Sequence, residues 1–188
     1  MVELTVATLI TLLRFVMVPA IVLALLSGRL DLALIGFVVA GVSDAVDGFV
    51  ARRFNQRSEL GAYLDPLADK LLLVSVFIVL GVMHELPLWL VVMAVSRDGL
   101  IVAGVLLSTI MSRPVTMKPL LVSKANTAMQ IVLAALVLAE LALSTSLGPL
   151  RPILIIVSGL LTVASAGAYL VGWLRHMNGN GEDATSNT

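Results

Sequence analysis

Four aspartates lie close together in a chain that is otherwise dominated by apolar residues. They are Asp44, Asp47, Asp65 and Asp69. A carboxylate at the centre of a membrane helix costs about 2.5–3.5 kcal/mol on insertion scales, so four without compensation would cost on the order of 10 kcal/mol, and less near the interface. A bound divalent cation would offset this charge. The aspartates are therefore candidate metal ligands.

Small residues and an arginine accompany the aspartates at fixed spacing. The pattern reads Asp-x-x-Asp-Gly-x-x-Ala-Arg and, after eight further residues, Gly-x-x-x-Asp-x-x-x-Asp, so its other positions are Gly48, Ala51, Arg52 and Gly61. Glycine lets a flat or extended ligand approach the backbone, and arginine suits a phosphate group. Together with metal ligands, these residues favour pyrophosphate chemistry, in which metal ions bridge phosphate oxygens.

The spacing predicts that the carboxylates project from two helix faces. Asp44 and Asp47 share one face of a helix. Asp65 and Asp69, four residues apart, share a face of the next helix, which Asp65 is expected to cap. A short link should make the two helices antiparallel neighbours, so that the carboxylate pairs face each other. Such an all-oxygen cage suits Mg²⁺ or Mn²⁺, and the lack of His or Cys disfavours zinc.

Each part of this pattern also has a simpler interpretation. Asp44 and Asp47 could form a polar contact between packed helices, and Gly48 and Ala51 could be a small-residue helix contact. Asp65 could be only a helix cap. The joint occurrence of eight fixed positions within 26 residues is what favours a ligand site.

The remaining composition indicates an integral membrane protein. The 188 residues are 59% hydrophobic and only 13% charged, with a mean hydropathy of +1.05, whereas soluble domains carry about 25% charged residues. There is no cysteine for disulfides or thiolate chemistry, and nothing points to a nucleic-acid partner. The first apolar segment lacks a basic leading region and a cleavage site, so we expect a retained helix. The absence of a transit segment favours a bacterial cytoplasmic (inner) membrane.

Six apolar segments reach or approach the roughly 20 residues needed to span a bilayer. They are Leu4–Leu26, Leu32–Val50, Leu67–Met83, Pro87–Met111, Leu120–Leu143 and Leu150–Leu174. We therefore predict an all-α membrane protein, a six-helix transmembrane bundle over residues 1–177. Residues 178–188 are small and polar, and are predicted to form a disordered tail.

The distribution of basic residues predicts the orientation in the membrane. With a cytoplasmic N-terminus, the outer loops hold two basic residues, Arg29 and Arg151. The inner loops and the C-terminal end hold seven: Arg52, Arg53, Arg57, Arg113, Lys118, Lys124 and Arg175. Because cytoplasmic loops carry an excess of Lys and Arg, both termini are predicted to be cytoplasmic. The aspartate cluster would then face the cytoplasm.

The complete pattern resembles the signature of CDP-alcohol phosphatidyltransferases, and all eight positions match. The resemblance implies a six-helix membrane fold, usually dimeric, whose site opens to the cytoplasm. It implies that the four aspartates hold two divalent ions and that Asp69 is also the base that takes the acceptor's hydroxyl proton. It implies that the CDP group lies along Asp44, Gly48, Ala51, Arg52 and Gly61. The implied reaction is attack of an alcohol on the lipid-side phosphorus of CDP-diacylglycerol, with release of CMP.

Further segments bear on which alcohol is the acceptor. Leu9–Arg14 is similar to the opening motif of phosphatidylglycerophosphate and cardiolipin synthases. Together with Val95–Asp98, Met117–Pro119 and Ser123–Gln130, it most resembles the CMP-forming cardiolipin synthases. The favoured acceptor is therefore phosphatidylglycerol, which would give cardiolipin. Glycerol 3-phosphate, which would give phosphatidylglycerophosphate, is the alternative.

Three basic residues are candidates for binding an acceptor phosphate: Arg97, Lys118 and Lys124. Arg97 is an intramembrane cation and hence a functional candidate. It could receive a phosphate, or it could pair with Asp98 or another carboxylate. Lys118 and Lys124 could bind phosphate or serve only as cytoplasmic orientation signals. Arg14, in the middle of an apolar segment, should have a role inside the bundle.

Two other classes of protein could use buried carboxylates. Intramembrane prenyltransferases also hold metal-bound pyrophosphate with paired aspartate motifs, but that class does not explain Gly48, Ala51 and Arg52 at these spacings. Ion-coupled transporters often show internal repeats and helices broken at the midplane, and this sequence shows neither clearly. Dependence on a cytidine nucleotide would separate the first alternative from the favoured function.

Overall fold

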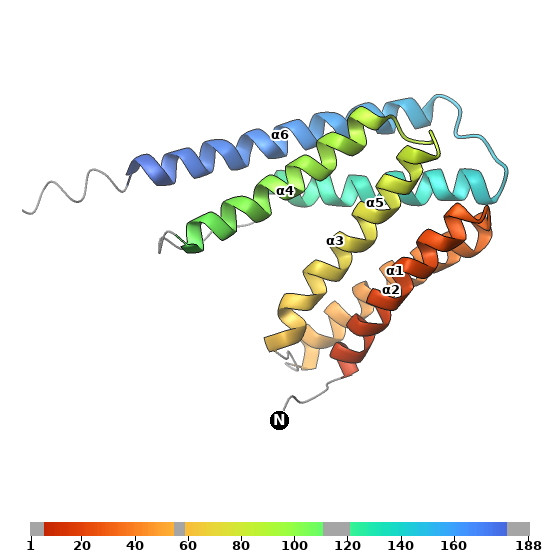
Figure 1. Cartoon of the computed structure of the whole chain (residues 1–188), viewed down its shortest axis with the longest axis horizontal. Coiled ribbons are helices and arrows are strands. Elements are labelled where there is room, and N and C mark those ends of the chain that lie inside the picture. The colour runs from red at the N-terminus through yellow and green to blue at the C-terminus, as the bar shows by residue number, and fades with distance from the viewer. Residues whose placement is uncertain (1–5, 55–58, 111–120, 180–188) are drawn as a thin grey trace, which may run out of the picture. The chain divides into compact units, whose positions relative to one another are not determined.

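A computed structural model of the chain describes residues 6–54, 59–110 and 121–179 (Figure 1). All regular secondary structure within these ranges is α-helical, so the predicted all-α class is confirmed for this part of the chain. The six helices are α1 (Val6–Leu26), α2 (Leu30–Phe54), α3 (Glu59–Val82), α4 (Leu88–Ile110), α5 (Leu121–Ala142) and α6 (Leu150–Gly179).

The two helices that carry the aspartates are longer than their apolar segments. α2 continues to Phe54, and α3 begins at Glu59. The prediction that Asp65 caps its helix is therefore wrong, because the helix starts six residues earlier. Arg52 and Gly61, on either side of the expected short link, likewise lie within helices, and residues 55–58 lie outside the described residues. Hydropathy marks where apolar residues stop, whereas helical hydrogen bonding continues through polar residues.

Two of the described helices are long and apolar enough to cross a membrane by length and composition. They are α5 and the stretch Leu150–Gly172 of α6, and shorter apolar stretches lie at Leu13–Leu26 and Leu30–Ser43. The six-span count and the cytoplasmic position of both termini stay predictions. α6 continues to Gly179, and residues 180–188, most of the predicted tail, lie outside the described residues.

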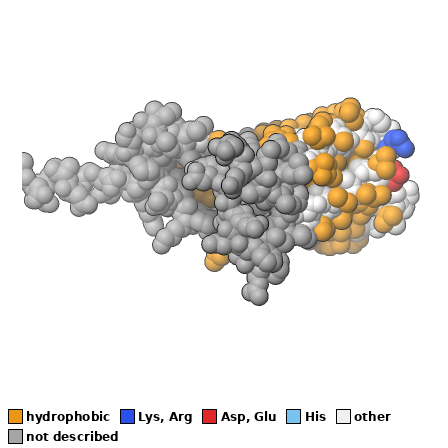
Figure 2. Space-filling view, turned by 90° about the horizontal axis from the view of Figure 1, so that it is seen from below, with side chains coloured by type: hydrophobic (Ala, Val, Ile, Leu, Met, Phe, Trp, Pro, Cys, Tyr) orange, Lys and Arg blue, Asp and Glu red, His pale blue; other side chains and the backbone are white. Residues whose placement is uncertain are grey.

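Exposed apolar side chains are abundant on the described surface. Every one of the six helices exposes large hydrophobic residues, such as Val16 on α1, Leu71 on α3 and Leu160 on α6. Figure 2 shows hydrophobic side chains covering much of the described face, with charged side chains at one end of it. Soluble monomers rarely expose such extensive apolar surface. The surface therefore agrees with a protein that contacts lipid.

The helices group into two compact units, each described here by itself. The first comprises Met1–Leu86 with Ile131–Arg151, and the second comprises Pro87–Gln130 with Pro152–Thr188. α5 is thus shared, because its first part up to Gln130 belongs to the second unit and its remainder to the first. That residues 1–177 form one membrane domain stays a prediction.

In the first unit, α1 packs against both α2 and α3. The buried core includes Leu25 of α1, Phe37 of α2 and Phe77 of α3. Gly36 of α2 lies at a close contact with α1, because a Cβ atom at this position would be 2.8 Å from Cγ1 of Ile21. Small residues commonly allow such close approach between membrane helices.

Three helices of this unit end in a left-handed residue that reverses the chain. After α1, Gly28 has a φ of 71°, and the Arg29 N–H bonds to the Ala24 carbonyl at 2.8 Å. Glycine is the usual residue at this position of a helix terminus. His84 and Ser144 occupy the equivalent position after α3 and α5, with φ values of 62° and 50°. These two positions carry a Cβ atom in a conformation that disfavours it.

Replacing His84 with glycine is expected to stabilise the protein. His84→Gly removes the left-handed penalty, which is about 1 kcal/mol, and should raise the melting temperature in detergent by roughly 2–4 °C. Ser27→Gly, at a neighbouring helix end without a positive φ, is the control and should give no gain. An unchanged or lower melting temperature for His84→Gly would show that the side chain makes a compensating contact.

Arg151 joins the connections at this end of the first unit. Its Nη2 lies 2.6 Å from Glu85 Oε2 and also donates to the Glu85 carbonyl oxygen, while Nη1 lies 3.2 Å from Glu140 Oε2. Glu140 Oε1 in turn accepts a hydrogen bond from the Leu147 N–H at 3.1 Å. Arg151, which the sequence suggests only as an orientation signal, therefore ties the α3–α4 connection to the end of α5 and the start of α6.

Candidate functional site

The eight motif positions lie on two consecutive helices of the first unit. α2 carries five of them in its C-terminal half, and α3 carries the other three. The backbone is helical through all eight, so positions 44 and 47 lie about 60° apart around the axis of α2, and positions 65 and 69 about 40° apart around that of α3. Of these residues, only Asp69 has a described side chain. How the other seven positions face each other across the two helices stays a prediction.

Asp69 forms an ion pair with an arginine from the first helix. Arg14 Nη1 of α1 lies 2.6 Å from Asp69 Oδ1 of α3. The Arg14 side chain is only 2% exposed, whereas that of Asp69 is 43% exposed. The arginine is thus held inside the unit, whereas part of the Asp69 side chain is accessible. This confirms the expectation that Arg14 has a role among the packed helices. Its partner, Asp69, was not predicted from the sequence.

The donor chemistry of the motif fits a hard divalent cation. Four carboxylates offer only oxygen ligands, which are the ligands that Mg²⁺ and Mn²⁺ prefer. The exposure of Asp69 leaves its carboxylate accessible to an ion. Among the side chains that the structure describes, no three His, Cys, Asp or Glu residues cluster as a metal site. The other three aspartates lie outside that set.

Arg97, the acceptor-binding candidate on α4, lies at the centre of a polar network in the second unit. It is 2% exposed, and its Nη1 lies 2.6 Å from Asp98 Oδ1. Its Nε donates to Ser165 Oγ at 3.1 Å, and its Nη2 donates to Ser123 Oγ and Ser165 Oγ at 2.5 Å each. The ring of Tyr169 lies 5.7 Å away, within cation–π range. Pairing with Asp98 is one of the two roles that the sequence suggests for Arg97, the other being phosphate binding.

A row of hydroxyl side chains on α6 faces this network, and the sequence reading did not find it. Ser158, Thr162, Ser165 and Tyr169 recur at helical spacing, and the first three are buried. Thr162 Oγ1 donates a hydrogen bond of 2.9 Å to Asn126 Oδ1 of α5, which links α6 to α5. The sequence does contain the pattern that could have revealed this row, because hydroxyl residues recur every three or four positions in an otherwise apolar segment.

Of the two lysines proposed to bind the acceptor phosphate, the structure describes one. Lys124 lies in the first turn of α5 and is exposed. Lys118 lies outside the described residues. The aspartate motif belongs to the first unit, and Arg97 and Lys124 belong to the second. Whether these basic residues bind an acceptor phosphate stays a prediction.

Comparison with known protein families gives one match over most of the chain. A family model described as CDP-alcohol phosphatidyltransferase matches residues 4–164. The matched range contains the complete aspartate motif and Arg14. It also contains Arg97 with its partners Asp98 and Ser123, whereas Ser165 and Tyr169 lie just beyond it.

Similar curated proteins carry two different names. Human cardiolipin synthase (CMP-forming) is 33% identical over 151 residues, which cover 72% of this chain and 50% of the relative. A putative cardiolipin synthase of Mycobacterium tuberculosis is 42% identical over 106 residues (55% and 49%). A probable phosphatidylglycerophosphate synthase of the same organism is 39% identical over 98 residues (49% and 47%). The chain therefore spans about half the length of the curated relatives it matches.

Proposed function

This chain belongs to the CDP-alcohol phosphatidyltransferase family, and we propose that it transfers a phosphatidyl group from CDP-diacylglycerol to an alcohol and releases CMP. The observation that carries the proposal is the complete eight-position motif, on consecutive helices and inside the matched range. The chain is an integral membrane protein, as its family, composition and exposed apolar surface indicate.

The proposed donor site uses the motif residues of α2 and α3. Asp44, Asp47, Asp65 and Asp69 would hold two divalent ions, Mg²⁺ or Mn²⁺. When bound, such ions would supply positive charge that stabilises a leaving phosphate. The CDP group would lie along Asp44, Gly48, Ala51, Arg52 and Gly61. Arg52 suits the diphosphate because its planar guanidinium can donate two parallel hydrogen bonds.

In the proposed transfer step, Asp69 accepts the proton of the acceptor's hydroxyl group. The hydroxyl oxygen forms a bond to the phosphorus attached to diacylglycerol. The bond from that phosphorus to the bridging oxygen breaks, and CMP departs with the electron pair. Arg14 acts as a positioning residue in this scheme, because it fixes one oxygen of the Asp69 carboxylate from a buried position.

The favoured acceptor is phosphatidylglycerol, and the product would then be cardiolipin. Two of the three relatives described above are named cardiolipin synthases. Glycerol 3-phosphate is the second candidate, supported by the relative named phosphatidylglycerophosphate synthase. Arg97, Lys118 and Lys124 are the proposed ligands of an acceptor phosphate. We further propose a homodimer in a bacterial inner membrane, with the site facing the cytoplasm.

A direct assay tests the activity and separates the acceptors. Purified protein in detergent receives CDP-diacylglycerol and Mg²⁺ or Mn²⁺, with phosphatidylglycerol in one tube and glycerol 3-phosphate in another. CMP and lipid products are then quantified. CMP with cardiolipin in the first tube supports the favoured acceptor, and phosphatidylglycerophosphate in the second supports the alternative. Absence of CMP with these two acceptors and with inositol and serine would contradict the proposed function.

Replacing Arg14 should reduce turnover through its effect on Asp69. Loss of a group that orients a metal ligand typically costs about 10–100-fold in metal affinity or activity, and we expect a loss in this range for Arg14→Met. Arg14→Lys should recover part of it, since a single ammonium replaces one of the guanidinium donors. The measurement is the rate of CMP release as a function of Mn²⁺ concentration.

The matched control for this prediction is Arg29→Met, which removes an exposed cation just after α1. If Arg14→Met and Arg29→Met show the same rates and the same Mn²⁺ dependence, Arg14 does not position Asp69. A purely structural role would lower the amount of folded protein without changing the Mn²⁺ dependence of the part that remains.

A further inference from the structure

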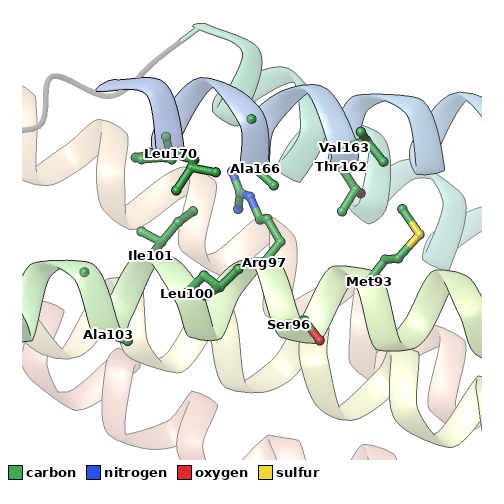
Figure 3. A pocket seen from close by; sticks show the side chains of 13 residues that line it. Met93, Ser96, Arg97, Leu100, Ile101, Ala103, Thr162, Val163, Ala166 and Leu170 are labelled. Atoms are coloured by element: carbon green, nitrogen blue, oxygen red, sulfur yellow. The ribbon is translucent and has the colours of Figure 1, made fainter. Parts of the chain in front are cut away.

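A partly open groove lies between α4 and α6, within the second unit (Figure 3). Its volume is about 570 Å³, within the range of about 300–1,000 Å³ typical of pockets that hold small molecules. Leu100 and Ile101 project into it from α4, and Leu170 projects into it from α6. Of the described residues to which the proposed chemistry assigns a role, only Arg97 lines this groove, so most of the lining has no assigned role.

The lining favours an apolar occupant. Nine of the thirteen lining residues are apolar or glycine. The strongest polar group in the lining, the Arg97 guanidinium, already bonds to Asp98, Ser123 and Ser165. Thr162, also in the lining, lies 2.8 Å from the Ser158 carbonyl oxygen. A hydrocarbon in the groove would leave these bonds in place, because it needs no hydrogen-bond partner.

The surroundings of the groove point to lipid as the source of that hydrocarbon. Leu100, Val163 and Leu170 border it and are 68%, 58% and 58% exposed. The α6 stretch Leu150–Gly172 is long and apolar enough to cross a membrane. Residues exposed on a membrane-crossing stretch contact acyl chains of the bilayer. If the groove stayed empty, the atoms of its walls would lose dispersion contacts. We propose that the α4–α6 groove holds one acyl chain of a bilayer phospholipid, lying beside Arg97.

A second copy of this chain is the competing occupant. A helix with its side chains is about 10–12 Å across, and the groove is already narrowed by leucine and isoleucine side chains from both walls. An unbranched chain fits such a slot better than a helix does. The proposal does not depend on which acceptor the enzyme uses, because it concerns a bound lipid and not turnover.

Two matched glycines on α6 provide the test. Gly167 lines the groove and Gly172 does not, and a Cβ atom at either would meet nothing within 4 Å. Gly167→Leu should therefore fill the groove without a clash, and Gly172→Leu is the control. Leucine favours helix more than glycine does, so neither variant should fail to fold.

Native mass spectrometry of detergent-solubilised protein with added palmitoyl-oleoyl-phosphatidylglycerol counts the bound lipid and the number of protomers together.

Gly167→Leu is expected to bind the added lipid roughly tenfold more weakly than wild type, since it displaces about two methylene groups. Gly172→Leu should match wild type. Equal lipid binding by all three proteins would overturn the proposal, as would equal losses in both variants. A change in protomer number with unchanged lipid binding would identify a second copy as the occupant.

The lack of cysteine allows an independent measurement at a single site. Ala166→Cys places a fluorescent label in the groove, and Gly172→Cys places one outside it. In vesicles of phosphatidylcholine brominated along one acyl chain, both labels should be quenched, because bromine quenches at contact. Strong quenching at position 172 without quenching at position 166 would show that no acyl chain enters the groove.

Discussion

Asp69→Asn is expected to lower CMP release by a factor of about 10²–10⁴, the usual contribution of a general base. The amide keeps the shape of the side chain but cannot accept the acceptor's proton at neutral pH. It also removes one anionic ligand from the proposed metal site, which should add to the loss. The buried Arg14 loses its counter-charge in this variant, but the amide oxygen can still accept its hydrogen bond. The folded protein should therefore still accumulate in the membrane, and its amount is measured beside the rate.

The control for this variant is Asp31→Asn, which makes the same chemical change at an exposed position in the first turn of α2. The measurement is the initial rate of CMP release per amount of folded, membrane-inserted protein. Rates that agree within twofold for the two variants would remove Asp69 from both the base and the ligand assignments. A loss of folded protein with an unchanged rate per molecule would make Asp69 a structural partner of Arg14.

Arg97→Met is expected to lower the free energy of unfolding by about 3–5 kcal/mol, the usual cost of removing one partner of a buried ion pair. The change leaves Asp98, which is buried, without the guanidinium that lies 2.6 Å from it. It also removes the donors to Ser123 and Ser165 that connect α4 with α5 and α6. Denaturation in detergent, followed by circular dichroism, measures the effect, with Arg29→Met as the exposed control.

The double variant Arg97→Met/Asp98→Leu separates the two roles proposed for Arg97. Replacing a buried ion pair by apolar residues of similar size is often neutral or stabilising, so the double variant should recover most of the lost stability. If Arg97 binds the acceptor phosphate, the recovered protein should still use phosphatidylglycerol poorly. Full recovery of both stability and turnover would show that Arg97 serves only to hold the three helices together. A stability loss no larger than that of Arg29→Met would contradict the buried-pair argument.

The motif and the class of fold could be predicted from the sequence because each depends on local chemistry. Aspartates at helical spacing in an apolar chain require compensation wherever the helices lie, and hydropathy alone indicates membrane helices. The pairing of Arg97 with Asp98 could also be predicted, because the two residues are adjacent in the sequence.

The contacts that could not be predicted from the sequence depend on how distant segments pack against each other. The pairing of Arg14 with Asp69 requires the placement of α1 against α3, across 55 residues of sequence. The contacts of Ser165 with Arg97 cross 68 residues. The start of α3 was placed too late because Asp65, just before the apolar segment that begins at Leu67, suits a helix cap, whereas the backbone is already helical from Glu59. Local capping signals cannot reveal a helix that continues through them.

The ion pair between Arg14 and Asp69 also limits how far the chain can be reduced. The signature is confined to α2 and α3, so a hairpin of these two helices would carry all eight of its positions. Such a hairpin would lack the buried cation that holds the proposed base, because that cation comes from α1. Any minimal or transplanted version of the site should therefore begin before Arg14. The same reasoning applies to chimaeras, in which α1 and α3 must be exchanged together.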